Sequence, residues 1–202
     1  MCPIQYVDPS VSRCKFDREL AEYRELAREY RSRGWFLLDC EFPKVLVAFC
    51  SRKATPAAVV MGASLDYTNY DAAPPSVRIV NPFTEEPYKF KELPSLLNRA
   101  ILGQELSLPG MPPGQKVVIP GLQAYMQAYG PDDVPFFCVA GVREYHEHPA
   151  HSGDLWELHR PTGAGRLVRL LDIIYRYGVE PIVGFNVQLI PQVSFNYGPP
   201  PS

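Results

Sequence analysis

The proline content constrains most strongly what this chain can fold into. The sequence has 22 prolines among 202 residues, and each one removes a backbone N–H and interrupts the interior of a helix or sheet. Prolines and glycines are frequent from residue 82 to residue 135. We interpret residues 82–135 as an insertion in a single domain of residues 1–202, because the stretch is too short and too broken to bury a second core. Within it, short helices are predicted over residues 93–102 and 122–129.

Regular structure is expected before this insertion. A helix over residues 16–33, ended by Gly34, is predicted from apolar residues at helical spacing: Phe16, Leu20, Tyr23, Ala27 and Tyr30. Three strand candidates follow over residues 35–41, 45–50 and 57–64, separated by short connections that contain proline, and a fourth candidate over residues 77–80 follows Pro74-Pro75. The short connections favour an antiparallel meander.

Regular structure is expected again after the insertion. Residues 136–145 are predicted to form a strand, and a loop rich in histidine follows. Apolar residues at helical spacing then predict a helix over residues 167–175, stopped by Gly178. The elements together indicate an α+β fold. Residues 192–202 end in Gly-Pro-Pro-Pro-Ser and are expected to form a flexible tail.

Charge and cysteine usage narrow the class of protein. The formal net charge is -2, whereas a dedicated nucleic-acid binder normally carries a basic excess. The sequence has no run near the roughly 20 apolar residues that span a bilayer, and residues 1–12 lack the layout of a secretory signal. Its cysteines are odd in number and form no CxxC pair, which is typical of reduced thiols. We therefore expect a cytoplasmic protein that binds neither nucleic acid nor membranes.

All the histidines of the chain fall in one short segment, which no fold requires. His146 and His148 would point the same way on an extended segment and, with His151 or Asp154, could hold zinc. An imidazole could instead act as a general acid or base. A third use is support of the thiolate of Cys138, which precedes the segment. The interpretations without a functional role are that the histidine segment is a polar loop and that Cys138 is a buried cysteine of a strand.

A known metallopeptidase motif shares part of this pattern. The run His146-Glu147-His148-Pro149 resembles the opening of the JAMM motif. Asp154 follows too soon for the usual spacing of that motif, and the sequence offers no convincing upstream glutamate. A JAMM-like peptidase is therefore the weakest alternative.

A second resemblance rests on residues 70–79, which are Tyr-Asp-Ala-Ala-Pro-Pro-Ser-Val-Arg-Ile. This stretch resembles the Tyr-Pro…Pro-Pro-x-Val-Arg-Phe segment of ubiquitin-conjugating (E2) proteins. The order of predicted elements is similar to that of divergent prokaryotic E2-like proteins. The resemblance implies the UBC-like (E2) fold, in which an N-terminal helix on an antiparallel β-meander is followed by an active-site loop and a C-terminal helix.

Two alignments place the E2 catalytic cysteine differently. In the first, Phe137-Cys138-Val139 matches the E2 Ile-Cys-Leu segment, and Trp156 matches the tryptophan that follows it. In the second, His148-Pro149 matches the E2 His-Pro-Asn motif and Trp156 occupies the cysteine position, which implies a non-catalytic variant. We favour the first alignment because it keeps a nucleophile. It lacks His-Pro-Asn directly before Cys138, so a loop histidine would have to stabilise the oxyanion.

The first alignment implies an E2-like transferase that needs no cofactor. Cys138 would receive a ubiquitin-like protein as a thioester from an E1-like activating enzyme and pass it to an amine of a target protein. In bacteria, such systems resemble antiphage conjugation operons. The alternatives are a non-catalytic adaptor that binds a ubiquitin-like protein and a zinc protein that uses His146, His148 and His151.

The resemblance also implies roles for residues of the loop. One of three imidazoles would stabilise the oxyanion or take up a proton: His146, His148 or His151. Asp154 would hold a histidine or orient the incoming amine. Trp156 and Arg160 would bind the modifier.

Overall fold

The N-terminal segment forms two helices. In the computed structural model, which describes residues 4–106, 110, 112 and 115–186, they are α1 (Pro9–Glu25) and α2 (Ala27–Arg33). Helix α1 begins early because the Asp8 carboxylate accepts the backbone N–H of Ser10 at 2.8 Å. The prediction of one helix over residues 16–33 is therefore wrong in two respects. The helix starts earlier, at Pro9, and it is interrupted at Leu26.

Gly34 ends α2, as predicted. Its φ of 98° is in the left-handed region, and a Cβ at this position would lie 2.3 Å from the carbonyl oxygen of Cys50. Only glycine allows the chain to leave the helix this close to the neighbouring strand.

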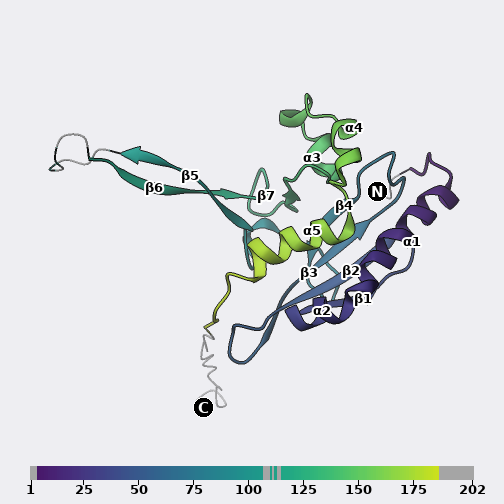
Figure 1. Ribbon diagram of the computed structural model, residues 1–202, viewed down its shortest axis with the longest axis horizontal. Helices are drawn as coiled ribbons and strands as arrows, with labels where there is room; N and C mark the ends of the chain where they lie inside the picture. Colours follow the sequence, from purple (N-terminus) through teal and green to yellow (C-terminus); the bar gives the residue numbers. More distant parts are fainter. Residues whose placement is uncertain (1–3, 107–109, 111, 113–114, 187–202) are drawn as a thin grey trace, which may run out of the picture.

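The predicted meander is confirmed as one four-stranded antiparallel sheet. Its strands follow the chain order (Figure 1): β1 (Trp35–Asp39), β2 (Lys44–Ser51), β3 (Ala58–Asp66) and β4 (Ser76–Val80). Val47 and Phe49 of β2 are fully buried and join the same core as Leu20 of α1. The fold is thus α+β, with an antiparallel sheet and several helices.

Helix α5 (Leu167–Ile174) completes this core and confirms the helix predicted over residues 167–175. A π-helical turn, η4 (Tyr175–Val179), continues it. Gly178 lies in this turn, where a Cβ would be 3.1 Å from the side chain of Leu97.

A buried carboxylate joins α1 to α5. Glu19 is 1% exposed, and it accepts the backbone N–H of Leu167 at 3.1 Å and the hydroxyl of Tyr70 at 3.3 Å. Arg18 lies 3.3 Å away and supplies a positive charge. These partners offset the cost of burying the charge, and the carboxylate occupies the N-terminus of α5, where the helix dipole favours it.

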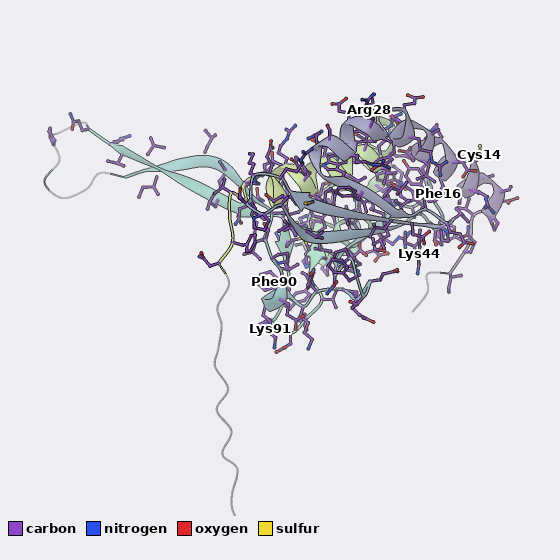
Figure 2. All side chains as sticks on the ribbon, turned by 90° about the horizontal axis from the view of Figure 1, so that it is seen from below. Cys14, Phe16, Arg28, Lys44, Phe90 and Lys91 are labelled. Carbon is purple, nitrogen blue, oxygen red and sulfur yellow. The ribbon has the colours of Figure 1, made fainter. Side chains whose placement is uncertain are left out.

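The proline-rich stretch contains strands where helices were predicted. Strands β5 (Asn98–Leu106) and β6 (Val117–Ala124) pair as an antiparallel hairpin, which we call the arm. Figures 1 and 2 both show the arm projecting from the body. The helices predicted over residues 93–102 and 122–129 are therefore wrong. Short apolar runs fit either period, and pairing across the hairpin decided for strands.

The strand predicted over residues 136–145 is also wrong beyond its first residues. Strand β8 (Phe136–Phe137) pairs with β7 (Met126–Gln127) and then stops. Gly141 turns the chain with a φ of 102°, and residues 143–147 form helix α3 (Arg143–Glu147). The remaining short helices before α5 are η2 (Pro149–His151), α4 (Trp156–His159) and η3 (Arg160–Thr162).

The predicted tail over residues 192–202 lies outside the described residues. Within the part of the chain that the structure describes, no helix combines the length and the apolar character needed to cross a membrane.

Candidate active site

Cys138 lies at the end of β8, beside an imidazole. Its backbone N–H donates to the carbonyl of Tyr125 at 2.7 Å. Tyr125 directly precedes β7, so this hydrogen bond holds Cys138 against the start of that strand. The thiol is partly exposed, and its Sγ is 3.4 Å from Nε2 of His151. Partial burial raises the pKa of the Cys138 thiol. The thiol is therefore protonated near neutral pH, and His151 is placed to accept its proton.

His148 holds the turn that carries His151. Its Nδ1 accepts the backbone N–H of Ala150 at 3.2 Å, so it caps η2. The proton on Nε2 then points to the hydroxyl of Tyr129, 2.8 Å away. The ring also stacks on Phe136 at 4.8 Å between centroids. His148 is thus a structural residue of the loop, and its two nitrogens are already used.

His146 is held by two backbone groups. Its Nε2 accepts the N–H of Gly141 at 3.2 Å, so its Nδ1 carries the proton and donates to the carbonyl of Asp154 at 2.8 Å. Burial lowers the pKa of His146, which keeps the ring neutral. The two ring nitrogens tie α3 to the loop that follows it.

Asp154 links the loop to the ring that stacks on His151. Its carboxylate accepts the Tyr145 hydroxyl at 2.6 Å and contacts Nε2 of His159 at 2.5 Å. These two contacts, the tyrosine first, lower the pKa of the Asp154 carboxyl, and burial with the same hydrogen bond raises the pKa of Tyr145 to about 12. The Tyr145 ring stacks on His151 at 3.9 Å between centroids. The Asp154 carboxylate therefore holds His159, and it reaches His151 through the ring of Tyr145.

The structure places Trp156 and Arg160 in surroundings that differ from those of the thiol. Trp156 is 6% exposed, and its Nε1 donates to the carbonyl of Asp71 at 2.9 Å. Arg160 lines a cavity of about 410 Å³ together with Arg18 and Arg166. Cys138 is not among the residues that line this cavity.

The geometry does not bring together the ligands of the zinc alternative. His146 and His148 do not flank an extended segment, because residues 143–147 are helical, so that expectation is wrong. Each ring already binds two groups of the protein. Among the described residues, no group of three or more His, Cys, Asp or Glu side chains is arranged to hold a metal ion.

Sequence reasoning missed three residues of this site. Tyr145 and His159 complete the network around Asp154. Glu144 accepts the backbone N–H of Val77 at 3.3 Å and lies 3.1 Å from the Arg78 guanidinium, so it fixes α3 to β4. His159 was visible as the fourth histidine of the cluster. The roles of Tyr145 and Glu144 depend on contacts across the fold, and no spacing in the sequence signals them.

Acidification should destabilise the protein through His146. The folded state keeps this ring neutral, whereas the unfolded chain takes up a proton near pH 6.5. The stabilisation is therefore complete above that pH and is lost as the pH falls through the lowered folded pKa. Thermal melting from about pH 8 to about pH 5, compared between the wild type and His146→Gln, measures the effect. The variant should show the flatter profile, and identical profiles would show that His146 contributes nothing.

Comparison with known proteins supports one family across most of the chain. The model of the Y4jH family, described as Y4jH-like, matches residues 7–182. The uncharacterized protein y4jH of Sinorhizobium fredii (strain NBRC 101917 / NGR234) is 43% identical over 197 residues, which cover 94% of this chain and 92% of that protein. The matched range contains the sheet, the arm, Cys138, the histidine loop and α5.

Proposed function

This chain belongs to the Y4jH-like family, and we propose that it is an E2-like conjugating enzyme that carries a ubiquitin-like protein as a thioester on Cys138. The observation that carries the proposal is the 3.4 Å contact between Sγ of Cys138 and Nε2 of His151. A thiol within reach of an imidazole is one arrangement that activates a cysteine for covalent acyl transfer.

The order of elements supports a UBC-like fold. Helix α1, the four-stranded meander, a partly exposed cysteine and helix α5 follow one another as that resemblance implies. Residues 70–79, which carry the most specific E2-like pattern, lie beside the site. Their Asp71 carbonyl binds Trp156, and the Pro75 carbonyl accepts the N–H of Arg143 in α3.

The two candidate positions for the E2 cysteine differ in environment. Trp156 is buried and bound to the backbone of residue 71, so it has the surroundings of a core residue. Cys138 is partly exposed and faces an imidazole. This contrast favours the alignment that makes Cys138 the nucleophile.

The proposed chemistry has two acyl transfers. Sγ of Cys138 attacks the carbonyl carbon of the E1 thioester while its proton passes to Nε2 of His151, and the C–S bond to the E1 breaks as that sulfur takes the proton. A target amine then attacks the new thioester. The C–N bond forms, the C–S bond to Cys138 breaks, and the proton lost by the amine returns to Sγ through His151.

The proposed partners are an E1-like activating enzyme, a ubiquitin-like protein and a target protein. The cytoplasm is the proposed location, and an antiphage conjugation system is the proposed setting. Arg160, with Arg18 and Arg166 in the cavity beside it, would bind the modifier. Trp156 would act indirectly, by holding the loop on residues 70–79.

A charging assay tests the proposal. The protein is mixed with ATP and with E1-like and ubiquitin-like proteins of the same organism, and the products are separated without reducing agent. In parallel, a peptide thioester with a C-terminal glycine is offered directly, and the intact mass is measured. An adduct that dithiothreitol removes is expected in both arms. If a ubiquitin-like protein binds but no adduct forms, the non-catalytic adaptor is the better description.

Replacing His151 should slow charging by about 10²–10⁴-fold, the usual contribution of a general acid–base group. His151→Gln keeps a planar side chain against Tyr145 but cannot take a proton. Charging rates measured against pH distinguish loss of the base from misfolding, because alkaline pH forms the thiolate without a base and should restore the rate of the variant. Glu147→Gln, at an exposed position of α3, is the matched control and should charge normally. An unchanged rate in His151→Gln would contradict the role given to His151.

A further inference from the structure

Three arginines from separate segments line one cavity of about 410 Å³: Arg18 of α1, Arg160 of η3 and Arg166 at the N-cap of α5. Like charges around one cavity repel one another, so an anion held between them is favourable. A planar guanidinium donates two parallel N–H bonds to a carboxylate or a phosphate, which suits arginine to this use. The cavity therefore has the donors that an anionic group requires.

The turn after η3 shapes this cavity. Gly163 has a φ of 74°, and a Cβ there would lie 2.8 Å from Cδ of Arg166, so the arginine stem packs directly on the glycine. Trp156 holds the same segment on the carbonyl of Asp71 at 2.9 Å. Tyr70 and Asp71 supply another part of the lining. The cavity is thus formed by segments that the fold holds together.

The ion pairs around the cavity leave one guanidinium without a partner. Each carboxylate at this cavity already faces a cation, in the pairs Lys15–Asp71, Arg18–Glu19 and Arg166–Glu22. The guanidinium of Arg160 has no ion pair or hydrogen bond within the described part of the chain. The remaining positive charge matches the single negative charge of a carboxylate. A phosphate monoester carries up to about two negative charges and would be repelled more strongly by Asp71.

We propose that this cavity binds an acidic side chain of the ubiquitin-like protein, with the Asp or Glu carboxylate of that partner held by Arg160 between Arg18 and Arg166. The inference rests on the proposed function, which assigns the modifier to this cavity, and adds the group that is recognised. Cys138 does not line the cavity, so the cavity is free to receive the folded body of a modifier whose C-terminus is bonded to the thiol. The modifier would then be held at two places.

Charging kinetics test this recognition. Arg160→Glu should raise the KM for the ubiquitin-like protein by at least about 10-fold, because a carboxylate would then face a carboxylate. The rate with the peptide thioester, which lacks the body of the modifier, should not change. Arg28→Glu makes the same charge change at an exposed position of α2 (Figure 2) and should leave both arms unchanged. If the wild type charges and Arg160→Glu leaves the KM unchanged, this inference is overturned and the proposed function stands.

A binding experiment tests the same recognition without any charging, so its result does not depend on a thioester at Cys138. The probes are two fluorescein-labelled peptides, one of four glutamates and one of four glutamines, and fluorescence anisotropy measures the Kd. The wild type and Arg28→Glu should bind the glutamate peptide at least about 10-fold more tightly than the glutamine peptide, and added salt should weaken this preference. Arg160→Glu should lose the preference. Equal binding of the two peptides by the wild type, or an equal loss in both variants, would overturn the inference.

Discussion

Cys138→Ala should form no thiol-sensitive adduct in the charging assay, while the wild type forms it readily. The sulfur is the attacking atom, and alanine offers nothing in its place. Cys138→Ser should give at most a slowly formed adduct that resists dithiothreitol, because an oxygen ester would replace the thioester. Non-reducing gels and intact mass, each with and without dithiothreitol, measure both variants.

Cys14 provides the control for this experiment. It is an exposed cysteine on α1 (Figure 2), remote in the chain from β8. Cys14→Ala should charge as the wild type does. An adduct that survives in Cys138→Ala and disappears in Cys14→Ala would show that Cys14 is the acceptor. That result would remove the basis of the proposed mechanism.

Trp156→Ala should lower the free energy of unfolding by about 3–5 kcal/mol, as expected when a large buried aromatic side chain is removed. The indole is 6% exposed and donates to the Asp71 carbonyl. Trp156→Phe keeps most of the apolar volume and should lose less, chiefly the hydrogen bond at about 1 kcal/mol. Urea unfolding followed by circular dichroism measures both values.

The neighbours of Trp156 supply a matched control in the same short segment. Leu155 and Leu158 are 57% and 64% exposed, and alanine at either position should change stability by less than about 0.5 kcal/mol. If Trp156→Ala were equally mild, the indole would not be a core residue, and the alignment that places it at the E2 cysteine position would gain support.

The sheet could be predicted from the sequence because its signals are local. Apolar β-branched runs separated by turns define β2 and β4, and the short turns allow only antiparallel neighbours. The arm could not be predicted in this way. Its run from Leu93 to Leu102 fits a helix nearly as well as a strand, and the choice depends on pairing with β6, a partner that follows later in the chain.

The position of the candidate site could be predicted, but the division of roles could not. The histidines that cluster after Cys138 in the sequence indicated the position of the candidate site. Which imidazole faces the sulfur depends on the turn at Gly141 and on the helical path of α3, which direct His146 to backbone groups and leave His151 beside the thiol. The histidines were expected to lie on an extended loop, whereas residues 143–147 are helical, and both rings bind groups of the protein.

The hydrogen bond from Leu167 to Glu19 joins residues 148 positions apart in the chain. On the ribosome, α1 emerges long before the helix whose end it caps, and Cys138 also emerges before that helix. The Glu19 carboxylate is therefore synthesised long before the backbone N–H that it accepts in the folded protein. A consequence is that a released fragment ending before Leu167 would leave the Glu19 carboxylate without this backbone N–H.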